Sequence, residues 1–151
     1  MPYYEKEERF MALALAEARK ALALGEVPVG AVVVLGEQVI GRGYNRRETD
    51  HSVIAHAEVL AIEDACRTLG TWRLNGCQLY VTLEPCPMCA GAIINARIQR
   101  VVYGVKDPKA GCCGSIADFF AMPFPTTPLC RSGILQEECS ALLRDFFSQL
   151  R

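Results

Sequence analysis

Two short segments of the chain carry residues whose types and spacing suit a metal site. His56 and Glu58 stand two positions apart in the first segment, and Cys86 and Cys89 stand three apart in the second, thirty residues further on. Zinc binds imidazole nitrogen and thiolate sulfur in tetrahedral geometry, and a catalytic zinc keeps its fourth position open for water. His56, Cys86 and Cys89 therefore make three ligands for one zinc ion. Glu58 is left unligated and can move protons.

Local geometry supports this division of roles. Cys86 and Cys89 lie at i and i+3 near an expected helix start, so they share one face, and the helix dipole there favours thiolate. In a regular helix, His56 and Glu58 would point about 200° apart. The helix must therefore begin at these residues if both are to reach the same ion. When bound, zinc lowers the pKa of a water molecule towards neutrality and so supplies a nucleophile.

The sequence also allows a closed, structural zinc site. Structural zinc normally takes four protein ligands, and the other histidine of the chain, His51, is the best candidate for the fourth. Glu84 and the remaining cysteines are poorer candidates. H-x-E and C-x-x-C each occur by chance, but the pair at this separation, with Pro85 before the first cysteine, favours the open site. A zinc-stabilised binding module without catalysis remains the alternative to an enzyme.

Hydrophobic periodicity predicts helices and strands that alternate around these two helix starts. Helices are expected at 5–24, 55–69, 85–96 and 136–150, strands at 29–35, 38–43, 77–83 and 100–105, and a short helical turn capped by Ser115 at 115–120. The expected inner faces of two helices are Val59, Ile62, Ala65, Cys66 and Leu69, and Cys139, Leu142, Leu143, Phe146, Phe147 and Leu150. This alternation predicts a layered α/β fold without giving its strand order.

Length and composition limit the broad class. A chain of 151 residues, 51% of them apolar, predicts one domain over residues 1–151 with a sizeable core. No apolar run approaches the roughly 18–20 residues of a membrane span. The acidic, polar first residues resemble neither a signal nor a transit peptide, so we expect a cytoplasmic protein with reduced cysteines. A net charge of −1 gives no general signature of nucleic-acid binding, although Arg and Lys cluster locally at 42–47, 97–100 and 106–109.

Beyond the metal motif, the chain resembles the bacterial tRNA-specific adenosine deaminases, a branch of the cytidine-deaminase-like superfamily. The H-x-E…P-C-x-x-C pattern identifies the superfamily. The stretches that indicate the tRNA branch are 25–31 (GEVPVGA), Asn45, 72–74 (WRL), 79–92 (LYVTLEPCPMCAGA), 97–98, 100–104, Asp107 and 114–115. The likeness departs from the family at 53–54, where Val-Ile replaces the usual Pro-Thr, and at 126–129.

The resemblance implies a three-layer αβα fold with a mixed five-stranded sheet, a homodimer with one zinc per subunit, and conversion of the wobble adenosine in a tRNA anticodon loop to inosine. Glu58 would be the catalytic proton carrier. Of the substrate contacts it implies, Asn45 would bond the flipped base or its ribose, Val29 would pack on the base, Asp107 would contact sugar or backbone, Lys109 would face a phosphate, and Phe147 would stack near the anticodon.

The residue pattern alone leaves other interpretations of these contacts open. Asn45 and Asp107 could be ordinary turn residues, and the apolar stripe of its helix favours Phe147 as a core residue. An alternative reaction is zinc-dependent deamination of a free base or nucleotide such as guanine, cytosine or deoxycytidylate. The near-neutral charge slightly favours a small substrate, whereas the flanking stretches favour tRNA.

Overall fold

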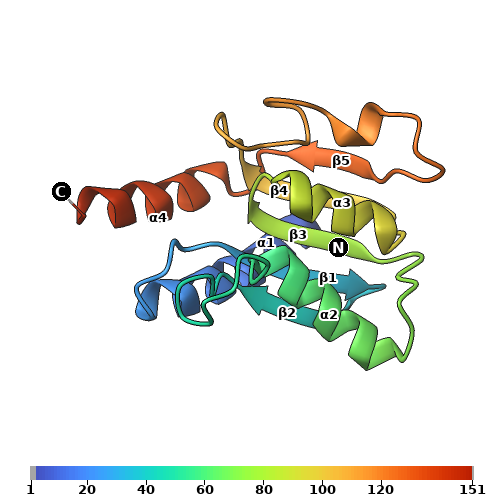
Figure 1. Ribbon diagram of the computed structural model, residues 1–151, viewed down its shortest axis with the longest axis horizontal. Helices are drawn as coiled ribbons and strands as arrows, with labels where there is room; N and C mark the ends of the chain where they lie inside the picture. The colour runs from blue at the N-terminus through green and yellow to red at the C-terminus, as the bar shows by residue number, and fades with distance from the viewer. Residues whose placement is uncertain (1–2, 151) are drawn as a thin grey trace.

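A computed structural model of the protein describes residues 3–150 and shows a mixed sheet with helices on both of its faces (Figure 1). The helices are α1 (Tyr3–Ala23), α2 (Ala57–Leu69), α3 (Pro87–Asn95), the 3-10 helix η1 (Phe119–Ala121) and α4 (Gln136–Ser148). The strands are β1 (Gly30–Leu35), β2 (Gln38–Tyr44), β3 (Gln78–Leu83), β4 (Arg100–Val105) and β5 (Leu129–Ser132). No helix among residues 3–150 combines the length and apolar character that crossing a bilayer requires.

The five strands lie in the order β2-β1-β3-β4-β5. Strand β1 runs antiparallel to β2 and β3, whereas β3, β4 and β5 run parallel to one another. Parallel neighbours need a crossover connection, and α3 lies in the crossover from β3 to β4. The mixed five-stranded sheet implied by the resemblance is thus confirmed, and the structure supplies the strand order that periodicity could not give.

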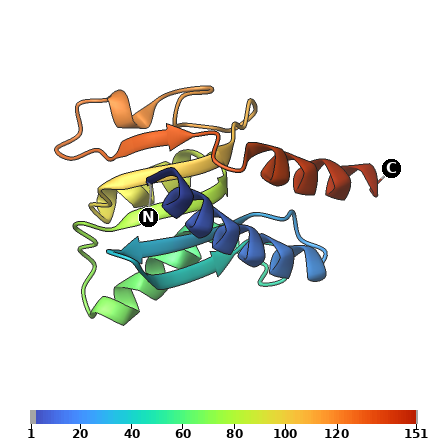
Figure 2. The same ribbon diagram turned by 180° about the vertical axis from the view of Figure 1, so that it is seen from behind.

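The sheet separates two hydrophobic cores. Helices α2 and α3 cover one face, and α1 crosses the other, as Figure 2 shows from behind. In β1, Ala31 and Val33 belong to the core under α2 and α3, whereas Val32 and Val34 belong to the core under α1. Successive strand side chains point to opposite faces, so one uninterrupted apolar strand fills both cores. This is why the central strands show no alternation of polar and apolar residues.

Helix α2 approaches β2 so closely that two positions of the strand accept only glycine. A Cβ added at Gly41 would lie 2.3 Å from the carbonyl oxygen of Ala61, and one at Gly43 would lie 2.4 Å from that of Ala57. Large side chains cannot fit between backbones at this separation. Apart from Glu58, the buried residues of α2 are therefore mostly small, namely Ala57, Ala61, Ile62 and Ala65.

The inner face of α2 that hydrophobicity predicted was partly wrong, because the helix packs so closely on β2. Ile62 and Ala65 are buried as expected. Val59 and Cys66 are only half-buried, and Leu69 is exposed. Because backbone proximity selects alanine, the most hydrophobic residues of this helix do not mark the side that touches the sheet.

The two helices beside the expected metal ligands begin two residues later than periodicity indicated. His56 is the N-cap of α2 and Cys86 is the N-cap of α3, and both have extended backbone, with φ −85° and ψ 153° for His56 and φ −77° and ψ 176° for Cys86. The N-cap side chain leaves the backbone before the first helical turn. This position explains how His56 and Glu58 reach one site although they are only two residues apart.

The C-terminal third differs most from the sequence expectations. The helical turn expected at 115–120 begins only at Phe119, and its cap is Asp118, whose Oδ1 accepts a hydrogen bond from the Phe120 N–H at 3.1 Å, so the assignment of Ser115 as cap was wrong. Strand β5 was not expected from periodicity. All four of its residues are exposed at the edge of the sheet, so it carries no pattern of buried apolar residues.

Helix α4 also differs, because it extends away from the sheet (Figure 1). Cys139 is buried as expected, but Phe147 is 49% exposed and Leu150 is 68% exposed. The apolar stripe of this helix is therefore only partly covered within the described chain, and its interpretation as a core face was wrong beyond the first turns.

We expect Gly41→Ala to lower the free energy of unfolding by about 2 kcal/mol, because the added methyl group would have to displace backbone atoms of α2. Urea denaturation followed by circular dichroism measures this. Gly91→Ala on α3 is the control, since no atom lies within 4 Å of the added Cβ. The higher helix propensity of alanine predicts a gain of up to about 1 kcal/mol there. Equal destabilisation by both variants would contradict the close approach.

Candidate active site

The three expected zinc ligands meet at one point. The donor atoms of His56, Cys86 and Cys89 all lie within 4.8 Å of one another, and Nδ1 of His56 is 3.6 Å from each sulfur. A tetrahedral zinc with Zn–N near 2.0 Å and Zn–S near 2.3 Å requires an N···S separation of about 3.5 Å. The donor set therefore fits zinc in both chemistry and spacing.

The alternative fourth ligand is not part of this group. His51 is exposed in the loop between β2 and α2, and the only donor cluster of this kind within residues 3–150 consists of the three ligands named above. The closed site built with His51 is therefore not what the structure shows. Glu84 is likewise absent from the cluster, because its carboxylate accepts hydrogen bonds from the loop at 107–115.

The fold brings the ligands together through two helix N-termini. His56 caps α2 and Cys86 caps α3, while Cys89 lies in the first turn of α3 and is fully buried. Pro87 occupies the start of α3, where a missing N–H costs nothing. The positive ends of both helix dipoles thus point at the thiols, where they favour negative charge.

The two thiols of the site differ in their pKa values. A hydrogen bond from the Cys89 thiol, opposed by burial and assisted by His56, lowers the pKa of Cys86 to about 4. The same bond, together with burial, raises the pKa of Cys89 far above its ordinary value. Metal ligation requires the deprotonated form of both, so binding must release the proton of Cys89.

Glu58 lies in the first turn of α2, 4% exposed and outside the ligand set. Burial raises the pKa of its carboxyl group to about 7, with a further contribution from the charge on Cys86. A carboxyl group whose pKa lies near ambient pH can both accept and release a proton. Its position and its environment therefore suit acid–base chemistry.

A cavity of about 240 Å³ opens beside these groups. It brings together three of the expected substrate contacts, Val29, Asn45 and Asp107, with His56 and Glu58. The remaining lining residues are Val27, Arg47, Ala57, Leu83, Glu84, Cys86 and Ala110. Segments from five parts of the chain thus enclose one space next to the metal ligands.

Lys109 and Phe147 lie outside that cavity and line a second hollow of about 390 Å³. The two hollows share the side chains of Val27, Leu83 and Asp107, so they are adjacent. The exposure of Phe147 in this hollow overturns its interpretation as a core residue. Lys106, Pro108 and Leu143 complete the second lining.

Asn45 and Asp107 prove to be turn residues that also face the cavity. Asn45 Nδ2 donates to the Val27 carbonyl at 3.1 Å, and its Oδ1 accepts from the Arg47 N–H at 3.1 Å. Asp107 Oδ1 accepts from the N–H groups of Lys109 at 3.0 Å and Ala110 at 3.3 Å. An amide has two N–H donors and two acceptor lone pairs, so these bonds orient Asn45 without exhausting it.

Glu84 organises the far wall of the cavity, which the sequence did not indicate. Its carboxylate is 2% exposed and accepts hydrogen bonds from the N–H groups of Asp107 at 3.0 Å, Cys113 at 3.0 Å and Ser115 at 3.1 Å, and from the Ser115 hydroxyl. Burial alone would raise its pKa, but these bonds hold that pKa below the ordinary value. A Cβ at Gly111 would lie 2.3 Å from this carboxylate. An acid directly after an apolar strand is the signal that could have revealed this role.

Comparisons with known proteins agree with the geometry. Residues 4–105 match the family model described as the cytidine and deoxycytidylate deaminase zinc-binding region. The chain is 50% identical over 147 residues to a tRNA-specific adenosine deaminase of Bacillus subtilis, covering 97% of this chain and 91% of that protein. A solved structure from a study of A-to-I editing by tRNA:A34 deaminases at the wobble position is 49% identical, with a TM-score of 0.87 over 89% of this chain and 99% of that one. A Bacillus subtilis guanine deaminase structure is 35% identical, with a TM-score of 0.65 over 85% of this chain and 87% of that chain.

We expect Glu84→Gln to lower the free energy of unfolding by about 1–3 kcal/mol, because the amide nitrogen cannot accept the bonds now made to the loop at 107–115. Guanidinium unfolding at pH 7 checks this. Glu63→Gln, on the exposed side of α2, is the matched control and should change little. The same small effect for both substitutions would contradict the anchoring role of Glu84.

Proposed function

The chain belongs to the tRNA-specific adenosine deaminases of the zinc-binding cytidine and deoxycytidylate deaminase family, and on this premise we propose that its site converts the wobble adenosine of a tRNA to inosine. The observation that carries the proposal is the arrangement of three zinc donors around a cavity with one buried, unligated acid. Adenosine and water give inosine and ammonia, so the site must add water to a ring carbon and move protons.

We assign His56, Cys86 and Cys89 to zinc and Glu58 to the protons. Zinc, when bound, supplies activation of the attacking water. Glu58 takes a proton from that water and delivers it to the ring nitrogen next to the reacting carbon. It then takes the remaining proton of the added hydroxyl group and transfers it to the amine, which leaves as ammonia while the carbonyl group of inosine forms. The carboxyl group is free for these transfers because it lies in the first turn of α2 beside the donor cluster and outside the ligand set.

The cavity beside Glu58 is the proposed place for the base. A base in an anticodon loop must swing out of its stack to be reached, which costs least in a single-stranded loop. Val29 offers an apolar surface for the ring, and Asn45 offers polar atoms for the base or its ribose. Asp107, shared by both hollows, stands where the sugar or backbone of the flipped nucleotide would pass.

The second hollow favours a polynucleotide over a free base. It carries the exposed ring of Phe147 and the ammonium group of Lys109 directly beside the base cavity. Aromatic side chains stack on bases, and lysine binds phosphate as a point charge. We assign these residues to the nucleotides that flank the reacting adenosine. A free base would fill the first cavity and leave the second hollow without a role.

We also propose that the protein works in the cytoplasm as a homodimer. All eight cysteines are free thiols, as expected in a reducing compartment. Large apolar side chains stand in solvent near the start of α2 and in the loop that Glu84 anchors. They include Val53 at 75% exposure, Ile54 at 55% and Ile116 at 60%. Contact with a second copy would remove such surface from water.

Deamination is tested by incubating the zinc-loaded protein with an unmodified tRNA that carries adenosine at the wobble position, and by measuring inosine. We expect turnover with tRNA, and no comparable turnover with free adenosine, guanine, cytosine or deoxycytidylate. Turnover of a free base or nucleotide alone would overturn the proposal in favour of the small-substrate reaction.

Glu58→Gln should retain zinc and lose at least about 10²-fold in turnover, because only the proton carrier is removed. Cys86→Ala should lose zinc as well as activity, since a ligand is removed. Metal content by mass spectrometry and inosine formation are measured on the same samples, with Glu63→Gln as control. A Glu58→Gln protein that keeps full activity would exclude the assigned proton carrier.

Sedimentation equilibrium should give a mass about twice the 16.6 kDa of the chain. Ile116→Asp should shift the protein towards the monomer, because a carboxylate would be buried in the contact. Leu69→Asp, at the opposite end of α2, should leave the mass unchanged. A monomer mass for the unaltered protein would contradict the dimer.

A further inference from the structure

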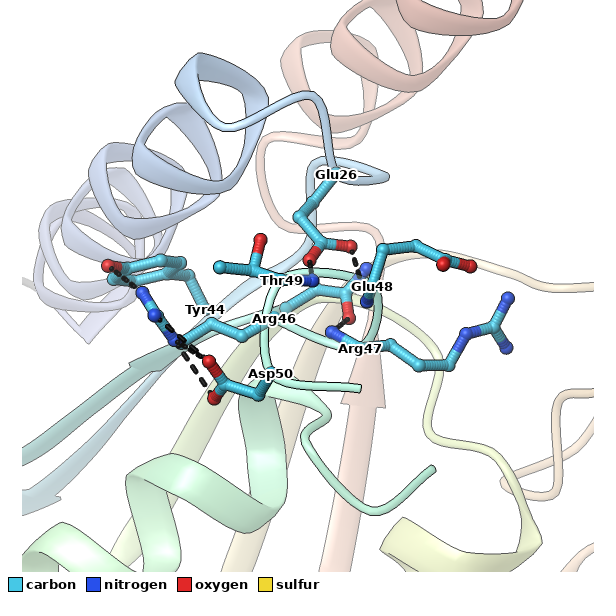
Figure 3. Close-up of polar contacts among 8 residues, drawn as sticks. Glu26, Tyr44, Arg46, Arg47, Glu48, Thr49 and Asp50 are labelled. Atoms are coloured by element: carbon cyan, nitrogen blue, oxygen red, sulfur yellow. Dashed lines mark hydrogen bonds and ion pairs between the residues drawn. The ribbon is translucent and has the colours of Figure 1, made fainter. Parts of the chain in front are cut away.

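Two adjacent arginines, of which Arg47 lines the base cavity, have different environments. Arg46 is used inside its own loop: Nε lies 3.1 Å from each oxygen of Asp50, Nη2 lies 3.0 Å from Oδ1, and Nη1 donates to the Tyr44 hydroxyl at 2.8 Å. These bonds and ion pairs raise the pKa of Arg46 above its ordinary value. Figure 3 shows this guanidinium lying between Asp50 and Tyr44. Arg46 is therefore a structural residue.

Arg47 has no such partner among residues 3–150. Its side chain is exposed, it forms no ion pair with a carboxylate of the described chain, and it lines the cavity that also holds Asn45 and Glu58. In Figure 3 its side chain extends away from the cluster around Arg46 and Asp50. A permanently charged guanidinium on the wall of a substrate cavity, with no ion pair to a carboxylate of the described residues, attracts an anionic group.

The backbone of this loop is held by a buried acid from another segment. Glu26, between α1 and β1, is 2% exposed, and its oxygens accept hydrogen bonds from the N–H groups of Glu48 at 3.2 Å and Thr49 at 2.6 Å (Figure 3). A buried carboxylate is tolerated only when such bonds compensate it. Burial raises its pKa, yet the bonds from Thr49 and Glu48 lower that pKa overall. Both donors stand directly after Arg47 in the chain.

Two hydrogen bonds of the Arg47 backbone itself also fix the loop. The Arg47 N–H donates to Asn45 Oδ1 at 3.1 Å, and its carbonyl accepts from the Ser52 N–H at 3.0 Å. With positions 48 and 49 fixed by Glu26, the backbone on both sides of Arg47 is held by hydrogen bonds.

We propose that Arg47 is an RNA phosphate contact at the mouth of the base cavity, and that Glu26 is the positioning residue that holds Arg47 there. The inference rests on the proposed tRNA substrate. In RNA the anionic group next to a flipped base is its phosphate, and a guanidinium can bind two phosphate oxygens at once. The protein has a net charge of −1, so attraction for RNA must come from local cations such as this one.

Binding of a fluorescent anticodon stem-loop RNA tests the inference, together with steady-state deamination of the whole tRNA. Arg47→Gln should weaken RNA binding on the order of tenfold at low salt, as expected for loss of a charged hydrogen bond. It should also reduce the slope of log affinity against log salt by about 0.7, the value for one phosphate on a single strand. KM should rise while kcat at saturation stays unchanged. Arg47→Lys should recover part of the salt slope.

Glu26→Gln should shift the same quantities in the same direction. If Glu26 acts through Arg47, the double variant will bind RNA about as weakly as Arg47→Gln alone. Its loss of affinity will then be clearly smaller than the product of the two single losses. Arg73→Gln, beside Trp72 beyond the far end of α2, and Glu37→Gln, 71% exposed in the turn between β1 and β2, are the matched controls. Neither control should alter affinity or the salt slope.

Three results would overturn the inference. Wild-type affinity and salt slope in Arg47→Gln would exclude the phosphate contact. Fully multiplicative effects in the double variant would show that Glu26 does not act through Arg47. A Glu26→Gln protein that fails to fold or to hold zinc would show that Glu26 has a general structural role. The proposed function is judged separately: wild-type protein that binds RNA in an Arg47-dependent way but forms no inosine would refute the reaction and leave this inference standing.

Discussion

The structure depends on bringing the N-termini of two helices to within ligand distance of each other. His56 and Cys86 are the N-caps of α2 and α3, and the histidine nitrogen lies 3.6 Å from the sulfurs of Cys86 and Cys89. An N-cap residue combines extended backbone with a side chain that points ahead of the helix. Residues thirty positions apart in sequence can therefore converge, while the helices themselves pack side by side on the same face of the sheet.

The two N-termini converge only because α2 and α3 pack closely on the sheet. Gly41 and Gly43 let α2 lie against β2 at backbone distance, and the crossover through α3 sets the second helix beside it. Because a protein interior is close-packed, a small displacement of one element is passed on to the elements packed against it. A helix moved outward by one methyl group would carry its N-cap with it, so Gly41 and Gly43 of β2 help to maintain the spacing of the zinc ligands.

Glu26, Glu58 and Glu84 are all buried, but their different surroundings give them different roles. Glu26 and Glu84 accept backbone hydrogen bonds from loops, which hold their pKa values below the ordinary range. Glu58 lacks comparable compensation, and burial raises its pKa to about 7. The first two anchor, through these hydrogen bonds, the two loops that form walls of the cavity. The third is left able to exchange protons between those walls.

The sequence by itself determined the donor set, the helices and most strands, because residue type and periodicity are local properties that need no knowledge of the fold. It named His56, Glu58, Cys86 and Cys89 and indicated the family. It missed β5, whose four exposed residues leave no pattern, and it misjudged the exposed end of α4. Only the tertiary structure decided the strand order, the anchoring roles of Glu26 and Glu84, and which of Arg46 and Arg47 lines the cavity. Those properties depend on contacts between segments far apart in sequence, and such contacts have no local signature.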